Sequence, residues 1–428
     1  MVRHVREDVG LRAAHLAEAG RLLWPAPARF VVQPSAPRTM SPGSPGSPGS
    51  PVSEFVLVPN AAQPRLLVPG RPRAVAAAAV RRYTSTSSRT ARARLQVLSM
   101  LLATGFGQRL LRDRACVYAD STTDAPLDTI ETYLRDVLGA DVQVSMHIGP
   151  ARANRKPILQ VLDPGGETVA FVKVGINDLT RRLVRAEAAS LVFLAGARLR
   201  TLEVPPLLHH GRWQDNEVLV LGVLPTWRRT PAREPVLRRA MLELAQVNGL
   251  TSMSQPLARS QYWQRLGRDV AALADDEARR SLGRVLHDLA PVAAATAVPL
   301  GSWHGDWTPW NMAARGQRLM VWDWERFTSG VPVGYDAVHY DLQHAVTRGG
   351  AAPEAAVHDT WSRSARLLEP FGIGPEQAPL VVASYLVEIA VRYLQDGQAG
   401  AGARLGHLGQ WLLPALVHHA HTMCTTSP

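Results

Sequence analysis

The sequence predicts an α+β protein with two lobes, a small β-rich lobe followed by a larger helical lobe, preceded by an N-terminal extension. Segments rich in β-branched residues and bounded by turn residues run from residue 119 to 225, whereas apolar residues at helical spacing dominate residues 226–428. A length of 428 residues allows two or three domains. The first third of the chain also differs from the rest in charge, which suggests a region of separate character.

The charge is concentrated in the first 115 residues, which hold 17 Arg against 5 acidic residues, while the remainder carries 30 basic and 31 acidic residues. The run SPGSPGSPGSP at Ser41–Pro51 has no apolar side chain to bury, so residues 1–52 are predicted to be a disordered basic tail and linker. The Arg residues are scattered among Ala and Pro without interleaved aromatics. This pattern favours a solvated extension over a nucleic-acid interface, which stays an alternative.

Residues 53–118 are predicted to form a small extension without a chemical motif. EFVLVPN and RLLVPG are typical of two short strands around a turn, and AVAAAAVRRY and ARLQVLSMLLATGFGQRLL of helices. A share of 46% hydrophobic and 19% charged residues indicates a globular chain. Two cysteines exclude a disulfide framework and favour a reducing, cytoplasmic setting, and we find no targeting or membrane-spanning segment.

The β-rich lobe, residues 119–225, begins with the helical segment PLDTIETYLRDVLG. Three strand candidates follow, VQVSMHI, PILQVLD and TVAFVKV, then the helix TRRLVRAEAASLVFLAGA and the strand EVLVLGVL. The helical lobe, residues 226–428, is interrupted only by a short strand-rich stretch between Ser302 and Phe327. This order of elements places a mixed lobe before a helical one.

The stretch from Ser302 to Phe327 carries the residues of greatest chemical interest. Asp306 lies in the tripeptide His-Gly-Asp, Asn311 follows five residues later, and Asp323 lies twelve residues further on in an apolar strand. One carboxylate can orient a hydroxyl group, and the other two side chains offer the hard oxygen ligands that Mg²⁺ prefers. Phosphoryl transfer from ATP needs this set, because positioning and charge stabilisation are the protein's main tasks.

These motifs resemble the aminoglycoside phosphotransferase and choline kinase-like family, which has the protein-kinase-like fold, from about Asp120 to the C-terminus. HGDWTPWN is similar to the catalytic loop of that family, which implies Asp306 as catalytic base and Asn311 as a magnesium ligand. VWDWE is similar to its metal-binding segment, which implies Asp323 as the second ligand. The resemblance implies ATP and Mg²⁺ as cofactors and a hydroxyl group as the phosphate acceptor. Taken singly, each motif also has a structural interpretation, such as a hydrogen-bond acceptor within a strand.

In the β-rich lobe, Lys173 of AFVKV is similar to the family's lysine that binds the α- and β-phosphates, and Glu187 of RAEAASL is similar to the helix residue that pairs with it. Composition adds an independent argument, because the chain has 45 Arg and only two Lys, Lys156 and Lys173. A compact ammonium fits between phosphates where a guanidinium fork would not. The structural alternative is a lysine on an edge strand whose ammonium reaches solvent.

The chain departs from the family pattern in the loop that would cover the phosphates. It has no GxGxxG, so we expect Gly149 and Arg152, with neighbouring backbone N–H groups, to bind the nucleotide there. The absence of a Walker A motif argues against a P-loop kinase. HGD in place of HRD, and Trp-Glu after Asp323 in place of Phe-Gly, argue for a small-molecule substrate rather than a protein.

Three residues are candidates for contact with the phosphate acceptor. Trp310 could stack on a sugar, and Asp336 and Asp341 could hydrogen-bond a polyol or attract an amine. Five tryptophans fall within residues 303–324, and packing beneath the loop is the other interpretation of that cluster. The predicted function is transfer of the γ-phosphate of ATP to a sugar, amino alcohol or aminoglycoside-like molecule. The alternative is a catalytically silent pseudokinase or a nucleotide-binding regulatory protein.

Overall fold

The fold is described from a computed structural model with side chains. It describes residues 2–34, 50–83, 89–119, 127–149, 154–226, 230, 232–249, 255–347 and 350–397. The chain divides into two compact units. The β unit comprises Met1–Ala151, Arg155–Arg185 and Pro206–Val223, and the helical unit comprises Arg152–Asn154, Ala186–Pro205 and Leu224–Pro428. The predicted α+β class, with a β-rich part and a helical part, is confirmed.

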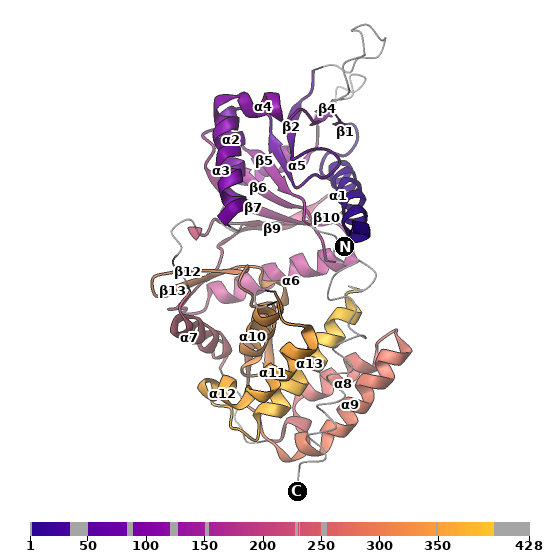
Figure 1. The fold of residues 1–428 in the computed structure, drawn as a ribbon, viewed down its shortest axis with the longest axis vertical. Coiled ribbons are helices and arrows are strands. Elements are labelled where there is room, and N and C mark those ends of the chain that lie inside the picture. Colours follow the sequence, from indigo (N-terminus) through magenta and orange to yellow (C-terminus); the bar gives the residue numbers. More distant parts are fainter. Residues whose placement is uncertain are drawn as a thin grey trace. The chain divides into compact units, whose positions relative to one another are not determined.

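Within the described residues, the β unit is built on one nine-stranded sheet of order β1-β4-β2-β3-β5-β6-β7-β10-β9 (Figure 1). All neighbouring strands are antiparallel. The strands are β1 Arg29–Gln33, β2 Ser53–Val58, β3 Leu66–Pro69, β4 Arg114–Tyr118, β5 Gln143–His147, β6 Ile158–Leu162, β7 Thr168–Gly175, β9 Leu207–Trp213 and β10 Asn216–Leu221.

Helices cover both faces of this sheet. Leu67 of β3 belongs to one buried cluster with residues of α1 and α5, whereas its neighbours Leu66 and Val68 belong to a second cluster with residues of α2 and α3. Successive side chains of a strand point to opposite faces, so a strand buried on both sides is apolar without alternation. The helices are α1 Val2–Leu23, α2 Arg73–Tyr83, α3 Arg89–Thr104, α4 Phe106–Leu110, α5 Ile130–Leu138 and α6 Asp178–Ala195.

The prediction of a disordered tail over residues 1–52 is wrong for residues 2–34. Leu16, Leu23 and Trp24 are fully buried in the same cluster as strands β5–β7, and the Trp24 indole donates to Glu131 at 3.1 Å. Strand β1 pairs along its whole length with β4. Although its composition is Arg-rich, α1 has apolar residues at helical spacing, Leu16, Ala19 and Leu23, and these bury one side of the helix. Most of the Ser-Pro-Gly repeat lies outside the described residues.

Residues 53–118 do not form a separate extension. Their strands β2, β3 and β4 lie in the nine-stranded sheet, and β3 joins them to β5 through the pairs Leu66↔His147 and Leu67↔Met146. The strands and helices predicted over this segment and over residues 127–221 are confirmed as β2, β3, β5–β7, β10 and α2–α6. The sequence analysis missed β1, β4 and β9, which have mixed polar character.

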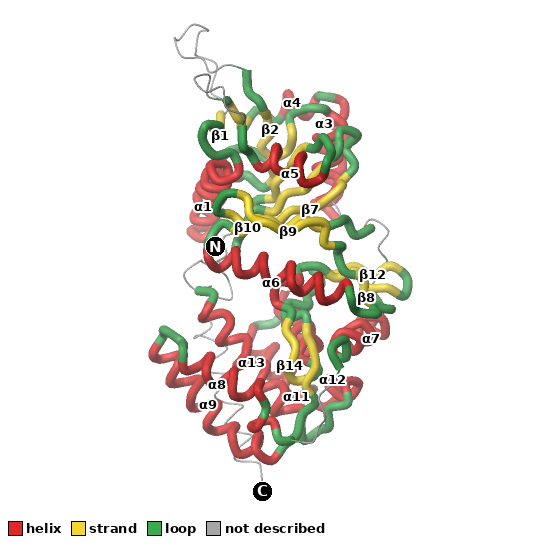
Figure 2. Tube along the Cα trace, turned by 180° about the vertical axis from the view of Figure 1, so that it is seen from behind, coloured by secondary structure: helices red, strands yellow, loops and turns green. Residues whose placement is uncertain are grey.

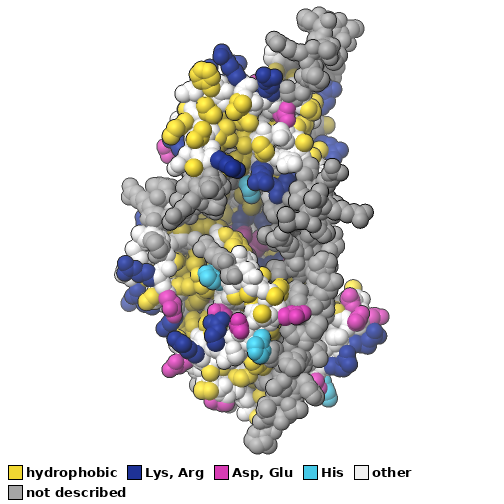
Figure 3. All heavy atoms as spheres, in the orientation of Figure 1, with side chains coloured by type: hydrophobic (Ala, Val, Ile, Leu, Met, Phe, Trp, Pro, Cys, Tyr) yellow, Lys and Arg dark blue, Asp and Glu magenta, His cyan; other side chains and the backbone are white. Residues whose placement is uncertain are grey.

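Large hydrophobic side chains are exposed on the face of the β unit that carries α3 and α4 (Figure 3). They are Val97, Met100, Phe106 and Leu110. The opposite side of α3 packs in the core through Leu102. The apolar run of α3 therefore serves the core with one side only.

The helical unit consists mainly of helices, with short strands in two small sheets (Figure 2). Strand β11 pairs with β14, and β12 and β13 form a hairpin that continues in parallel to β8. The helices are α7 Glu234–Ala245, α8 Gln261–Ala271, α9 Asp276–Ala295, α10 Tyr335–Thr347, α11 Pro353–Ser362, α12 Ser364–Leu368 and α13 Ala378–Gln395. The strands are β8 Leu202–Glu203, β11 Leu300–Trp303, β12 Met312–Arg315, β13 Arg318–Val321 and β14 Thr328–Pro332.

Helix α13 is the central helix of this unit. Twelve of its residues are buried, and it contacts α8, α9, α10 and α12. Among the described helices it is the one long and apolar enough to span a bilayer by length and composition, but most of that stretch is buried inside the fold. Its hydrophobicity is accounted for by burial on nearly all sides.

Candidate active site

The β12–β13 hairpin brings together two residues that are twelve positions apart in the sequence. Asn311 directly precedes β12 and Asp323 follows β13 by two residues. The backbone N–H of Trp322 donates to the carbonyl of Asn311 at 3.1 Å, which extends the ladder of the hairpin by one pair. The open end of the hairpin therefore carries both predicted magnesium ligands.

The loop before β12 orients Asp306 toward Asn311. The side-chain amide of Asn311 donates to the Asp306 carbonyl at 3.0 Å and to Asp306 Oδ2 at 2.9 Å. Because its NH₂ group is used as donor, Asn311 Oδ1 is the atom suited to a metal ion. Gly305, which lies between β11 and β12, has φ of 83°, and a Cβ there would clash with the carbonyl oxygen of Arg326. The sharp turn before Asp306 thus requires glycine.

His304 connects this loop to the segment of Asp323. Its Nδ1 accepts from the backbone N–H of Asp306 at 3.1 Å, so Nε2 carries the proton and donates to the Trp322 carbonyl at 3.1 Å. Burial lowers the pKa of His304 to about 4, which keeps the ring neutral. Both ring nitrogens of His304 are therefore used in hydrogen bonds to the backbone of the loop and of the Asp323 segment.

Asp336 lies beneath the loop, which corrects the expectation that it contacts the substrate. It is 4% exposed, and its two oxygens accept from the backbone N–H groups of His304 at 2.8 Å and Gly305 at 3.2 Å. Burial raises the pKa of Asp336 to about 7, partly offset by these two hydrogen bonds. The residue fixes the backbone that carries Asp306. No sequence signal distinguished this buried acid from an exposed one.

The carboxylate of Asp306 is the accessible acid of the loop, with a side chain 38% exposed. Burial raises the pKa of Asp306, but the hydrogen bond from His339 outweighs this effect, so the pKa lies below its ordinary value. Asp306 is therefore an ionised acceptor at neutral pH. An ionised, partly exposed carboxylate can accept a hydrogen bond from a hydroxyl group.

Asp323 lies in a group of three carboxylates. Asp323, Glu187 and Glu325 each offer an oxygen, and these oxygens lie within 4.8 Å of one another. Asp323 has φ of 76°, a backbone conformation that non-glycine residues rarely adopt and that clusters at functional sites. Glu187 Oε1 also accepts from the backbone N–H of Trp324 at 3.2 Å. Such an all-oxygen group suits a hard cation such as Mg²⁺.

Glu325 was not predicted as a site residue from the sequence. Its position two residues after Asp323 is a local signal, since an Asp-x-Glu segment can direct two carboxylates to one ion. Glu187 was predicted to pair with Lys173, and the structure places it beside Asp323 and Glu325 in the helical unit. Lys173 belongs to the β unit, and its pairing with Glu187 stays a prediction.

Lys173 is 7% exposed on β7, opposite Ile158 of β6 and Leu219 of β10. The alternative of an edge-strand lysine is wrong, because β7 has neighbours on both sides. Gly149 lies at the end of the described part of the loop after β5, and Arg152 lies outside the described residues.

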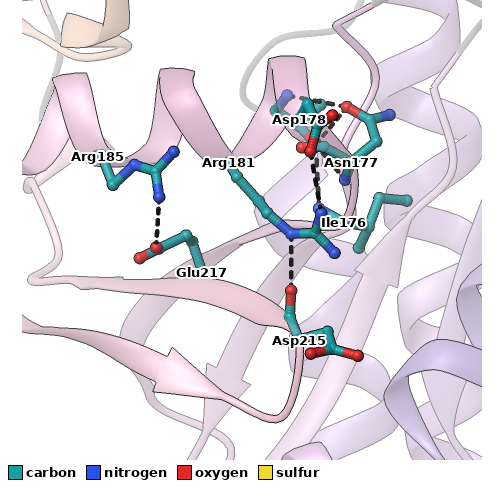
Figure 4. A network of polar contacts seen from close by, with 8 residues as sticks. Ile176, Asn177, Asp178, Arg181, Arg185, Asp215 and Glu217 are labelled. Carbon is teal, nitrogen blue, oxygen red and sulfur yellow. Dashed lines mark hydrogen bonds and ion pairs between the residues drawn. The ribbon is translucent and has the colours of Figure 1, made fainter.

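The first half of α6 is tied to the β9–β10 hairpin within the β unit (Figure 4). Arg185 Nη1 donates to Glu217 at 3.0 Å, and Arg181 Nε donates to the Asp215 carbonyl at 2.6 Å. The Thr180 hydroxyl stabilises the turn before the helix, because it accepts from the backbone N–H groups of Ile176 and Asn177 at 3.0 Å each. These contacts fix the first part of α6 against the β9–β10 hairpin.

The remaining two candidates for acceptor contact differ in environment. Trp310, beside Asn311, is 41% exposed, whereas Trp303, Trp307 and Trp324 are buried, so the packing interpretation holds for those three. Asp341 is bound by Arg363 at 3.1 Å and by the Thr360 hydroxyl at 2.8 Å. It therefore ties α10 to the residues of α11 and just beyond, and Trp310 is the candidate presented to solvent.

Comparisons with known proteins found solved structures only. No protein-family model matches the chain, and no curated protein matches it. The chain is similar to a fructosamine-3-kinase from Haemophilus somnus (13% identity, 68% of this chain and 97% of that one, TM-score 0.41). It is also similar to the aminoglycoside phosphotransferase APH(4)-Ia solved with ADP and hygromycin B (16% identity, 68% of this chain and 98% of that one, TM-score 0.44). A third similar structure is that of the choline kinase LicA from Streptococcus pneumoniae (12% identity, 68% of this chain and 99% of that one, TM-score 0.40). At this level of likeness the residues of the site themselves decide which function is proposed.

Proposed function

We propose that this chain is a magnesium-dependent phosphotransferase that moves the γ-phosphoryl group of ATP to a hydroxyl group of a small molecule. The observation that carries the proposal is the arrangement of Asp306, Asn311 and Asp323. One loop and one hairpin of the helical unit bring an ionised, accessible carboxylate next to two oxygen ligands. Phosphoryl transfer from ATP uses this combination, with the carboxylate orienting the attacking hydroxyl group and the oxygen ligands holding Mg²⁺.

In the proposed reaction the acceptor hydroxyl donates its hydrogen bond to Asp306. The hydroxyl oxygen forms the new bond to the γ-phosphorus, the bond from that phosphorus to the bridging oxygen of ADP breaks, and the hydroxyl proton passes to Asp306. Asn311 and Asp323, with Glu325 and Glu187 close to Asp323, would hold magnesium. Bound Mg²⁺ neutralises charge on the phosphate oxygens.

ATP binding is proposed to involve the β unit as well. Lys173 is the candidate for contact with the α- and β-phosphates, because a lysine buried in an apolar strand of an arginine-rich chain has a specific use. Gly149 and Arg152 remain the proposed residues of the phosphate-covering loop. The cytoplasm, where ATP is made and consumed, is the proposed location, in keeping with the free, buried Cys116.

The acceptor is proposed to be a sugar, an amino alcohol or an aminoglycoside-like molecule. Trp310 supports this class, since an exposed indole next to the proposed metal ligand Asn311 offers a flat apolar face for a ring. Asp336 and Asp341 no longer support it, because both carboxylates are bound within the fold.

The test is Mg²⁺-dependent release of ADP from ATP by the full chain, across a panel of sugars, amino alcohols and aminoglycosides, with the Asp306→Asn variant beside it. Acceptor-stimulated ADP release that the variant lacks is expected. Binding of MgATP without turnover in the presence of any acceptor would instead indicate a pseudokinase or a nucleotide-binding regulatory protein. If the chain showed neither binding of MgATP nor turnover, both the phosphotransferase and the nucleotide-binding alternative would be excluded.

A further inference from the structure

His339 makes a contact with the proposed base that no sequence motif indicated. It lies on α10, is 1% exposed, and its Nε2 is 3.3 Å from Asp306 Oδ1. Its other ring nitrogen, Nδ1, is 2.9 Å from the hydroxyl of Tyr385 on α13. Three side chains thus form a line of hydrogen bonds that starts in the core and ends at Asp306.

The direction of these hydrogen bonds follows from the chemistry of their ends. An ionised carboxylate only accepts, so His339 donates through Nε2 to Asp306. Burial lowers the pKa of His339, although the bond to Asp306 counteracts this, so the ring is neutral and its Nδ1 is an acceptor. Burial raises the pKa of Tyr385 well above its ordinary value, so its hydroxyl keeps the proton and donates to Nδ1. The tautomer of His339 is therefore set by Tyr385.

Each of the two carboxylate oxygens of Asp306 therefore accepts a hydrogen bond from a different side chain. Asn311 binds Oδ2 at 2.9 Å and His339 binds Oδ1, which removes the rotation that a singly bound carboxylate retains. One face of α10 supports the loop twice, because Asp336 and His339 are three residues apart on that helix. Asp336 fixes the backbone of the loop, and His339 fixes the side chain that the reaction uses.

We propose that His339 is a positioning residue for phosphoryl transfer, which orients the Asp306 carboxylate toward the acceptor hydroxyl through its Nε2–H donor. This inference rests on the proposed function. A carboxylate turned away from the hydroxyl would lose its alignment at the moment of proton transfer, and an error of about 1 Å can cost about 10²-fold in rate.

The experiment compares His339→Leu, His339→Gln and the control His344→Leu, an exposed histidine one to two turns further along α10. The reaction followed is Mg²⁺-dependent hydrolysis of ATP with water as acceptor. His339→Leu is expected to lower kcat about 10- to 100-fold while the KM for MgATP changes less than about twofold. His339→Gln, which restores an N–H donor, is expected to recover most of the loss. His344→Leu should match the wild type.

Adding His339→Leu to the Asp306→Asn variant distinguishes a positioning role of His339 from a purely structural one. In single-turnover measurements on Asp306→Asn, adding His339→Leu should change the rate less than about twofold, because the group it orients is gone. The inference would be overturned if His339→Leu lowered the rate equally in the wild type and in Asp306→Asn, or if it left kcat unchanged. It would also be overturned if a folded His339→Gln were as slow as His339→Leu.

A third variant covers the case in which His339→Leu does not fold. Tyr385→Phe removes the donor that sets the tautomer of His339, so kcat should fall about threefold to tenfold. A folded Tyr385→Phe with wild-type kcat would overturn the inference in that case. If the wild type and Asp306→Asn both lack turnover, the proposed function itself fails and the role of His339 fails with it. Turnover in the wild type with no effect of His339→Leu contradicts the role of His339 alone.

Discussion

The first 118 residues and the segment from residue 300 to 343 contrast in how their sequences relate to their structures. The N-terminal residues contribute four strands and a fully buried helix face to the β unit, yet their sequence is Arg-rich and lacks any chemical motif. The later segment is short, and its residue types and spacing indicated its chemistry before the fold was known. Chemistry requires particular side chains, whereas packing requires only apolar ones at a suitable period.

The two regions should therefore fail in different ways when altered. Changes in the N-terminal region should unfold the β unit, and changes in the later segment should remove activity from a folded chain. Five experiments follow, from the largest expected effect to the smallest. Four test that difference, and the variants of Lys173 and Glu187, which lie in neither region, test the proposed ATP site.

Removal of residues 1–52 is expected to abolish folding of the β unit. The deletion takes away Leu16, Leu23 and Trp24 from the core and the strand that pairs with β4, so apolar side chains such as Phe55 lose their cover. The measurements are the yield of folded protein and the thermal unfolding transition of a chain that begins at Ser53. A well-folded, active chain would show that α1 and β1 are dispensable. Leu16→Ala is the milder companion, with an expected loss of about 2–5 kcal/mol of unfolding free energy.

Asp306→Asn should leave the thermal unfolding transition nearly unchanged and lower kcat about 10²- to 10⁴-fold, because an amide does not accept the hydroxyl proton. Asp341→Asn is the matched control, since that acid is bound by Arg363 away from the loop. Its kcat should stay within about a factor of two of the wild type. Activity of Asp306→Asn within a factor of three of the wild type contradicts its role as base.

Asp323→Ala should remove the dependence of ATP binding on Mg²⁺. The change takes one carboxylate from the group that it forms with Glu187 and Glu325, and hard-cation affinity falls with the number of such ligands. Calorimetric titration with ATP, with and without Mg²⁺, measures the difference. Asp276→Ala, on the surface of α9, serves as a control for loss of one acidic residue. Equal MgATP affinity in Asp323→Ala and the wild type would mean that Asp323 is structural.

Lys173→Arg should impair turnover nearly as much as Lys173→Ala, by up to about 10²-fold, although charge is kept. The site is enclosed on β7 between Ile158 and Leu219, where the wider guanidinium would shift the phosphates from their in-line position. A smaller defect is expected for Glu187→Gln. Steady-state kinetics of the three variants decides the matter: wild-type turnover in Lys173→Arg alone would show that any positive charge suffices.

The smallest effect concerns a pair of histidines, one in each of the two regions. Burial lowers the pKa of both His15 and His304 to about 4, with Arg155 adding to the effect at His15. Between about pH 6.5 and 4 the unfolded chain binds protons that the folded chain does not, so stability is lost as pH falls through this window. Each histidine contributes at most about 1.4 kcal/mol per pH unit.

Chemical denaturation at pH 7 and pH 5 measures this effect in His15→Gln and the wild type. The difference in unfolding free energy between the two pH values should be smaller in the variant. An identical pH dependence would show that His15 is protonated, or free to become so, in the folded chain. His304→Gln is the counterpart in the second region and should lower kcat as well, since His304 supports the Asp306 loop.

Much of the fold was predictable where periodicity was strong. Strands β5–β7 and helices α5 and α6 follow their predicted segments, because their apolar residues recur at the expected spacing. Strands β1, β4 and β9 were not predicted, since their residues are mixed in polarity. The pairing of β4 with β1 and β2 also joins residues far apart in the chain.

The site shows the same division between chemistry and position. Asp306, Asn311 and Asp323 were predicted as site residues from residue type and spacing, and the structure adds the hairpin that brings Asn311 close to the segment of Asp323. Asp336 was expected at the substrate and lies under the loop instead. A carboxyl group has the same appearance in a sequence whether it binds a ligand or caps backbone N–H groups.

The sequence by itself determined the α+β class and the order of most elements and predicted the candidate site residues, because these depend on local periodicity and local side-chain chemistry. Tertiary structure alone decided that α1 belongs to the core, that Glu187 lies beside Asp323, and that His339 and Asp336 support the loop from one face of α10. Each of these depends on contacts between residues far apart in the chain, or on a strained backbone at Asp323. Such contacts follow from how the helices and strands pack, and local composition carries no record of them.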